Sequence, residues 1–343
     1  MYPIVLALLS ALLFGASTPM GKLLLESLPT FQLAGWLYLG AAAGVAPGLI
    51  RTRVQRHPLR RIGKKNLMRL AGAIGFGGVA GPVLLLMGLQ RASSASVALW
   101  LNLELVATAV LGFLIFHDHL GRGGWCGVAG TLLASVMLSW QQGEVRLLAM
   151  ALVAGACLCW GLDNHLTALI DGITPQQSTF WKGLVAGGVN LVIGLCLEPV
   201  GAGIFPPAAA MGVGVFAYGM SLTLYIKAAH YLGATRSQMI FSSAPFFGVA
   251  LSIPLLGKWI SMVEAIAAGV LIVSWIILFR DQHSHPHTHD AQHHGHDHNH
   301  TDGHHNHSHS GLPPETAHHH QHRHEPDAHA HPHWPDIHHR HRH

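Results

Sequence analysis

The sequence predicts an all-α integral membrane protein of ten transmembrane helices, built as two inverted five-helix repeats and followed by a disordered, His-rich tail. Half of its 343 residues are hydrophobic and only 10% are charged, whereas about a quarter of the residues in a soluble domain are charged. Apolar runs of roughly 20 residues, the length that crosses the hydrocarbon core, recur over the first 280 positions. A lipid bilayer is therefore the expected solvent.

Each apolar run is expected to be a helix, because a backbone exposed to lipid must satisfy its own hydrogen bonds. The first run has no basic region before it and no cleavage signal after it, which favours a retained helix over a removed signal peptide. All 4 cysteines fall inside the runs, where they are expected to pack as small apolar side chains. The predicted spans are residues 3–25, 31–50, 67–90, 95–116, 123–140, 147–170, 176–198, 208–231, 235–256 and 260–279.

Basic residues indicate the orientation of these spans. The segment RTRVQRHPLRRIGKK, residues 51–65, is the most basic loop between them, and the positive-inside rule places such a loop in the cytoplasm. With ten spans both termini then lie on that side, so we expect a multi-pass protein of the cell (inner) membrane with cytoplasmic termini. Topology explains the basic loop better than nucleic-acid binding does, and no nucleic-acid partner is expected.

The tail, residues 281–343, belongs to a different class of sequence. Histidines alternate there with Asp, Asn, Pro and Gly, and almost nothing could build a core. We expect a disordered cytoplasmic tail that binds divalent metals such as Zn, Ni or Co at interchangeable weak sites, because selective sites need ligands held by surrounding contacts. A solvated or pH-responsive tail is the alternative. The candidate ligands are His285, His287, His289, His294, His296, His298 and His300.

An internal repeat connects the two halves of the membrane region, residues 3–140 and 147–280. A shift of 146 positions places Phe14 over Trp160, and a shift of 141 positions places Glu104 over Pro245. Because five spans are an odd number, the second unit must enter the membrane upside down relative to the first. Inverted repeats are typical of secondary transporters, which bind the substrate between the repeats near the midplane.

The sequence resembles the EamA-like proteins of the drug/metabolite transporter superfamily. The resemblance rests on the ten spans, the duplicated units, the FG followed by small residues in the first span, and the segment GLQRASSASVALWLNLELVATAVLGFLIFHDHLGRGGWCGVAGTLLASVML. It covers residues 3–280 and implies a carrier of metabolites, uncoupled or ion-coupled. In FHDHLG, Asp118 takes the place of the Glu in the family's turn after the fourth helix. Glu104 stands where the family often has Pro, so the resemblance assigns no substrate site there.

Glu104 lies near the middle of the predicted span 95–116. A carboxylate at that depth costs at least about 2.5 kcal/mol and is too short to reach the interface, so it should face protein or water. Trp100 and Thr108 are expected on the same face, one turn away on either side. We interpret Glu104 as a carboxylate that binds a proton, a cation or an amine. The alternative is a structural Glu that ties two helices together.

The sixth span offers a partner for Glu104. In CWGLDNHLTALI, four side chains fall on one helical stripe suited to a cation or a polar substrate: Trp160, Asp163, Asn164 and Thr167. Hydrogen bonding between helices is the alternative role of this stripe. Ser17 is the small counterpart of Asp163 in the first span. Lys182, six residues inside the seventh span, either reaches the interface or neutralises Asp163, and His165 is expected as an interior histidine.

These features favour a secondary transporter, a permease or exporter of a small metabolite or organic cation bound between the repeats. The sequence has no H-E-x-x-H, G-x-S-x-G or P-loop motif, so we expect neither an enzyme nor a required cofactor. A divalent metal (Ni/Co/Zn) transporter and a membrane-anchored metal sensor or buffer that acts through the tail are the alternatives. A metal transporter is less favoured, because the predicted spans contain no cluster of cysteine thiolates or paired histidines that could bind the metal. Homo-oligomerisation, direction and coupling ion are left open.

Overall fold

The computed structural model forms two compact units, residues 1–281 with 334–343 and residues 282–333, which are described separately. Asp118 of the FHDHLG turn lies outside the part of the chain that the structure describes. The described residues are 2–51, 63–116, 121–140, 144–170, 173–198, 203–232, 234–257, 259–280, 283–289, 292–298, 318–324 and 327–333.

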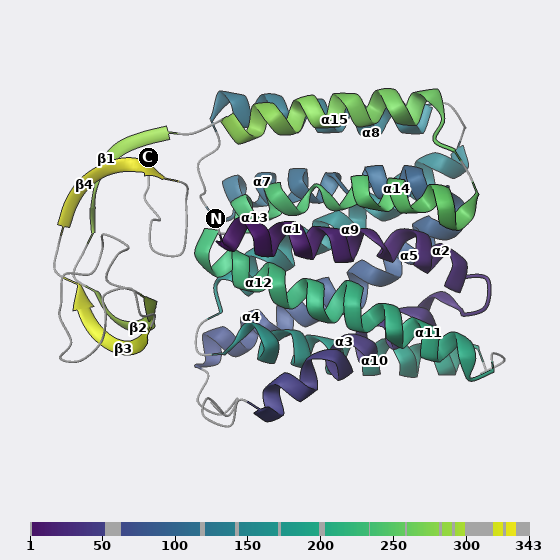
Figure 1. Ribbon diagram of the computed structural model, residues 1–343, viewed down its shortest axis with the longest axis horizontal. Helices are drawn as coiled ribbons and strands as arrows, with labels where there is room; N and C mark the ends of the chain where they lie inside the picture. Colours follow the sequence, from purple (N-terminus) through teal and green to yellow (C-terminus); the bar gives the residue numbers. More distant parts are fainter. Residues whose placement is uncertain are drawn as a thin grey trace. The chain divides into compact units, whose positions relative to one another are not determined.

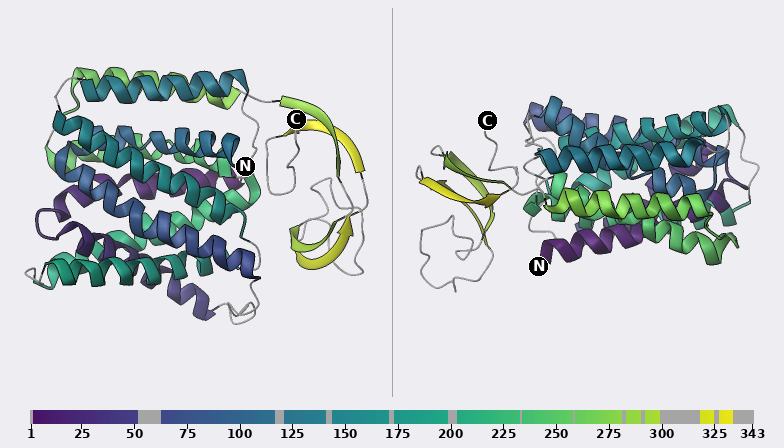
Figure 2. Two further views of the ribbon diagram at one scale, coloured as in Figure 1. Left: turned by 180° about the vertical axis from the view of Figure 1, so that it is seen from behind. Right: turned by 90° about the horizontal axis from the view of Figure 1, so that it is seen from above.

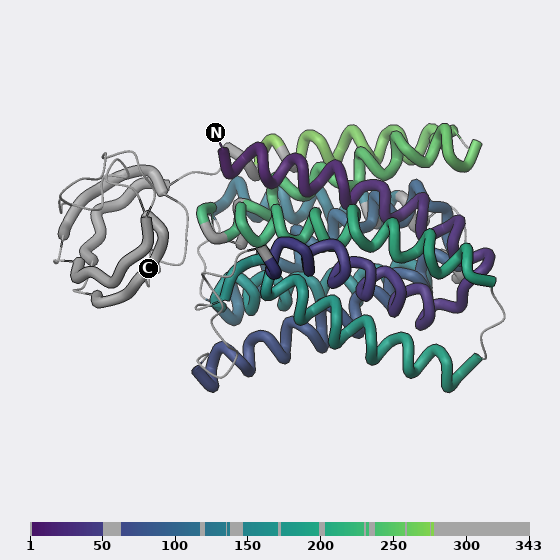
Figure 3. The backbone as a smooth tube through the Cα atoms, turned by 60° about the horizontal axis from the view of Figure 1, so that its bottom comes forward, coloured from purple at the N-terminus to yellow at the C-terminus, as the bar shows by residue number. Residues whose placement is uncertain are grey.

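The first unit is a bundle of helices whose long members run along roughly one common direction (Figure 1; Figure 3). Its first half contains α1 (Tyr2–Gly15), α2 (Ser17–Leu24), α3 (Thr30–Arg51), α4 (Lys64–Ala73), the π-helix η3 (Ile74–Ala80), α5 (Gly81–Arg91), α6 (Ser94–Trp100), α7 (Leu103–Leu114) and α8 (Arg122–Trp140). Its second half contains α9 (Glu144–Ala168), α10 (Pro175–Leu197), α11 (Phe205–Val213), the π-helix η4 (Gly214–Met220), α12 (Ser221–Leu232), α13 (Ala234–Phe241), α14 (Ala244–Leu256) and α15 (Met262–Arg280).

Eight segments of the described chain are long and apolar enough to cross a membrane. They match all the predicted spans except the fifth and the tenth, and several of them join two helices, such as α6 with α7. The structure has α8 and α15 at the two remaining positions, and these helices pack against each other along one edge of the bundle (Figure 1; Figure 2). The predicted multi-pass membrane architecture is thus confirmed for eight spans.

Irregular segments recur in the two halves of the chain at nearly the same spacing. The π-helix η3 begins at residue 74 and η4 begins at residue 214, 140 positions later. The fourth span is interrupted at residues 101–102 and the ninth at residues 242–243, 141 positions later. This second spacing equals the shift at which the two halves align in sequence. Inversion of the second unit stays a prediction.

Glycines in and beside η3 allow the third span to approach the sixth very closely. A Cβ on Gly77 would overlap the carboxylate of Asp163, and a Cβ on Gly81 would lie 2.6 Å from Nε1 of Trp160. Any larger residue at these positions would push α9 away. The glycines therefore set the position of the polar stripe on α9.

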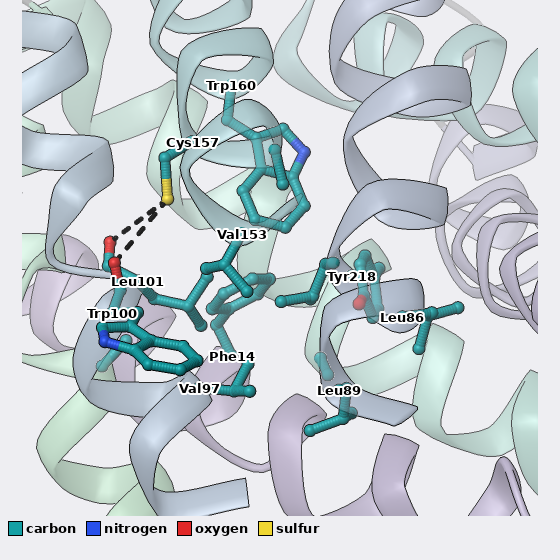
Figure 4. Close-up of a cluster of buried hydrophobic side chains, with 14 of the residues drawn as sticks. Phe14, Leu86, Leu89, Val97, Trp100, Leu101, Val153, Cys157, Trp160 and Tyr218 are labelled. Atoms are coloured by element: carbon teal, nitrogen blue, oxygen red, sulfur yellow. Dashed lines mark hydrogen bonds between the residues drawn. The ribbon is translucent and has the colours of Figure 1, made fainter. Parts of the chain in front are cut away.

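The main apolar cluster of the bundle lies beside this stripe (Figure 4). It includes Phe14, Val153, Cys157 and Trp160, with Trp100 fully buried among them. The Cys157 sulfur lies 3.9 Å from the carbonyl oxygens of Trp100 and Leu101, and it packs as the small apolar side chain that the sequence predicts. All four cysteines are free, and Cys126 and Cys196 are exposed.

The described residues of the second unit form four strands, which pair in two antiparallel ladders, β1 with β4 and β2 with β3. Their bounds are β1 (His283–His289), β2 (Gln292–His298), β3 (His318–His324) and β4 (Asp327–His333). The ladders differ from the disordered tail that the composition predicts. However, an isolated two-stranded ladder is at best marginally stable in water, and these four sequences contain no large apolar side chain. Backbone pairing is thus the main interaction within these ladders, and the other residues of the tail predicted to be disordered lie outside the described part of the chain.

Candidate functional site

Glu104 lies in the first turn of α7, just after the interruption of the fourth span. At this interruption the Asn102 side chain donates a hydrogen bond to the Leu99 carbonyl at 3.1 Å. The Glu104 side chain is only 6% exposed. It therefore faces the inside of the bundle, as the high free energy of a carboxylate in hydrocarbon requires.

Neutral amide groups from two other helices bind the Glu104 carboxyl group. Asn164 on α9 donates from Nδ2 to Glu104 Oε1 at 3.0 Å. The same Nδ2 lies 3.2 Å from Gln238 Oε1 on α13 and 3.3 Å from Thr108 Oγ1. The Gln238 side chain also hydrogen-bonds Glu104. The network thus joins α7, α9 and α13 around one acidic group.

Asp163 forms a buried ion pair with Lys182 on α10. Lys182 Nζ lies 2.7 Å from both carboxylate oxygens, and Thr167 donates to Asp163 Oδ1 at 2.8 Å. The sequence left two alternatives for Lys182, and the structure has the pairing with Asp163. Asp163 and Asn164 are adjacent in sequence, but Asp163 pairs with Lys182 and Asn164 hydrogen-bonds Glu104. The stripe predicted as one polar surface is therefore divided between two networks.

Trp160 contacts the backbone of η3. Its indole Nε1 donates to the Gly77 carbonyl at 2.9 Å, and the Tyr38 hydroxyl donates to the same oxygen at 2.8 Å. Trp160 also packs edge-on against Phe14, with 6.2 Å between the ring centroids. Its polar atom is thereby satisfied within the protein, and its ring adjoins the Glu104 network.

Three other residues considered from the sequence lie outside this network. Trp100 does not share a regular helical face with Glu104, because the helix is interrupted between them, and Trp100 instead packs in the apolar cluster (Figure 4). Ser17 is buried at the start of α2, beside the Tyr218 hydroxyl. His165 stacks on Phe116 at 4.4 Å and lies 2.8 Å from the Thr108 carbonyl oxygen, as expected of an interior histidine.

Gln238 is the residue that sequence reasoning missed. It lies near the beginning of the predicted ninth span, where a polar side chain is ordinarily interfacial. In the structure the side chain is 2% exposed and hydrogen-bonds Asn164. The available signal in the sequence was the uncharged amide itself, within an otherwise apolar predicted span.

Aromatic rings from both halves of the bundle form a connected group that begins at Trp160. Successive centroids lie 5.1 to 6.2 Å apart, the spacing of edge-on and tilted ring pairs. The connected rings belong to Trp160, Phe14, Tyr218, Tyr38, Phe241 and Tyr225. The Glu104 network therefore borders an aromatic region.

The chemistry of this site is that of oxygen and amide groups. Among the described residues, no three His, Cys, Asp or Glu side chains are arranged to hold a metal ion. Of the predicted tail ligands, His300 lies outside the described residues and the others lie on β1 and β2. The strand register places several of them opposite histidines: His285 opposite His331, His287 opposite His329, His294 opposite His322, His296 opposite His320 and His298 opposite His318.

Comparisons with known proteins give a consistent picture. The model of the EamA-like transporter family matches residues 1–140 and 147–280. A protein of Methanothermobacter thermautotrophicus named uncharacterized transporter is 26% identical over 294 residues, which cover 79% of this chain and 84% of that protein. The uncharacterized transporter YyaM of Bacillus subtilis is 24% identical over 283 residues, covering 77% of this chain and 90% of that protein. A solved crystal structure superimposes with a TM-score of 0.60 over 80% of this chain and 96% of the other, at 16% identity, which shows a shared fold.

Proposed function

The chain belongs to the EamA-like transporter family, and from this premise we propose that it is a secondary carrier of a small metabolite or organic cation in the cell (inner) membrane. We assign it ten crossings, namely the eight described spans together with α8 and α15. The repeats 3–140 and 147–280 are then inverted relative to each other, because each has five crossings. Both termini lie in the cytoplasm by the positive-inside rule. The protein is a transporter and not an enzyme.

The buried Glu104 carboxyl group is the observation that carries this proposal. An ionisable side chain inside a membrane bundle is a functional-site hypothesis by default, because selection for packing alone favours an apolar residue there. The partners of Glu104 are neutral amides, which orient the carboxylate without neutralising it. A proton and a cationic substrate can therefore bind Glu104 alternately. A carrier that couples substrate transport to protons requires such an exchange.

The surrounding residues have distinct roles in this proposal. Asn164 orients Glu104 and lies close enough to the bound substrate to contact it. The Asp163–Lys182 pair and Thr167 fix α9 against α10. Trp160 provides an aromatic wall beside the acid, over which a cation is attracted by the ring quadrupole.

The test is transport by the full-length protein in proteoliposomes across a panel of amines, amino acids and divalent metals. We expect Glu104→Gln to abolish coupled flux while the protein still folds. Glu26→Gln, at an exposed glutamate of the same unit, is the matched control and should transport normally. Unchanged flux in Glu104→Gln would remove the site assignment.

Divalent metal transport, or metal sensing and buffering by the tail, is the second candidate. The strand register supports metal binding by the tail, because it places histidines opposite each other between β1 and β4 and between β2 and β3. We propose that the tail binds metal without taking part in the carrier step. A chain ending at Arg280 should keep its flux of organic substrates. A Ni, Co or Zn flux that is lost only on this truncation would favour the metal transporter instead.

A further inference from the structure

Two hydroxyl groups beside the Glu104 network lack hydrogen-bond partners. Tyr225 on α12 and Ser237 on α13 are 5% and 0% exposed. Neither hydroxyl has a partner among the residues that the structure describes. Buried polar groups in native proteins are nearly always paired, so an orphan calls for an occupant such as a ligand or a water molecule.

Both hydroxyl groups belong to the same part of the bundle as Glu104. Ser237 precedes Gln238, which binds Glu104 and Asn164. The Tyr225 ring packs on Phe241, one helical turn after Ser237, with 5.1 Å between centroids. The Tyr225 hydroxyl also lies within electrostatic range of the Glu104 carboxylate. Because α13 packs against both α7 and α12, the acid and the two hydroxyl groups lie on neighbouring helices of one part of the bundle.

The charges around the site restrict what that molecule can be. Among the side chains that the structure describes, the basic ones of the neighbouring spans are already engaged: Lys182 on Asp163, Lys22 on the Leu89 and Ala92 carbonyls, Arg69 on the Leu169 carbonyl and Lys227 over the Tyr2 ring. None of these described cations is left to pair with a substrate carboxylate near Glu104. Because burying an unpaired charge is strongly unfavourable, the site disfavours amino acids and other carboxylates.

The net charge of the site also argues against a divalent cation. Asp163 is neutralised by Lys182, which leaves a single carboxylate, that of Glu104, for the substrate. A monovalent cation balances this charge, and a proton replaces it one for one. A divalent metal would keep an excess positive charge and would find too few oxygen ligands for its preferred coordination.

We propose that the substrate is a small monovalent amine with a hydroxyl group, whose ammonium pairs with Glu104 and whose hydroxyl bonds to Tyr225 and Ser237. This inference rests on the proposed carrier function. The aromatic rings beside the acid accommodate the carbon skeleton and attract the ammonium. A site with orphan hydrogen-bonding groups discriminates strongly against an analogue that lacks the hydroxyl, because the groups then stay unpaired in the complex.

The test measures exchange of labelled 2-aminoethanol in proteoliposomes against unlabelled competitors. Propylamine has a methyl group in place of the hydroxyl, and glycine has a carboxylate in place of the hydroxymethyl group. For the unsubstituted protein, we expect propylamine to need at least about tenfold, and glycine at least about a hundredfold, the concentration of 2-aminoethanol for half-inhibition. Tyr225→Phe and Ser237→Ala should each lower the propylamine ratio, and the double variant Tyr225→Phe/Ser237→Ala should bring it close to one. Tyr231→Phe, at an exposed tyrosine of α12, should leave it unchanged.

A second measurement keeps folding apart from binding. 2-Aminoethanol should raise the thermal midpoint of the purified full-length protein and should raise that of Tyr225→Phe less. Equal competition by propylamine or glycine, or no exchange of 2-aminoethanol, overturns the inference. If Glu104-dependent flux of another compound is then found, the carrier proposal still stands. If no flux depends on Glu104, the carrier proposal fails as well.

Discussion

The Asp163–Lys182 pair gives a stability prediction whose magnitude follows from its geometry. Lys182 Nζ contacts both carboxylate oxygens at 2.7 Å, and both side chains are buried. Replacing one partner leaves the other charge buried and uncompensated, which costs about 3–5 kcal/mol. We therefore expect Lys182→Met and Asp163→Asn each to lower the free energy of unfolding by that amount.

The double variant Asp163→Asn/Lys182→Met separates charge pairing from packing. It leaves no buried charge at this position, so its free energy of unfolding should return close to that of the unsubstituted protein. Equilibrium denaturation in mixed micelles measures all three variants. Thr167→Val, which removes one bond to Asp163, serves as a graded control and should cost about 1.5–3 kcal/mol. Additive losses in the double variant would refute a paired, ionised Asp163 and Lys182.

Three further predictions concern neighbouring features. Gly77→Ala should destabilise the protein by about 1–3 kcal/mol through overlap with Asp163, whereas Gly75→Ala in the same π-helix, which has open space, should be nearly neutral; equal thermal midpoints would contradict this. Gln238→Leu should slow Glu104-dependent exchange about tenfold, the loss expected when one orienting hydrogen bond is removed, and an unchanged exchange rate would show that Gln238 does not orient the acid. Zinc titration by calorimetry should give several weak sites on the full chain and none on a chain ending at Arg280; equal binding by both chains would place the metal elsewhere.

The sequence was sufficient to predict most of the membrane architecture. Hydropathy located the eight segments that are long and apolar enough to cross a membrane. The sequence shift of 141 equals the spacing between the interruptions of the fourth and ninth spans, but the interruptions themselves were not predicted. The buried position of Glu104 and the proximity of the sixth span could also be argued, because a carboxylate excluded from lipid must meet another helix. These inferences depend on the lipid solvent and on the spacing of apolar residues along the chain, and both can be read from the sequence.

The arrangement of individual partners was not predictable in the same way. Trp100 was placed beside Glu104 on the assumption of a continuous helix, and the interruption at residues 101–102 changes the rotation between them. Gln238 reaches Glu104 only because α13 packs against α7 and α9, which is a tertiary fact. The pairing of Lys182 with Asp163 similarly depends on the packing of α10 near α9. Local periodicity contains no information on which helices become neighbours.

The interruption of the fourth span also has an electrical consequence. Because α7 starts at Leu103, Glu104 lies in its first turn, where the helix dipole favours a negative charge. In the proposed carrier this dipole stabilises the carboxylate after the substrate has left, which favours release of the substrate. In the matching half-helix, α14, the first turn holds Pro245 and no acid. Only one of these two positions therefore has an acidic side chain, and the proposed carrier would bind one positive charge in each cycle.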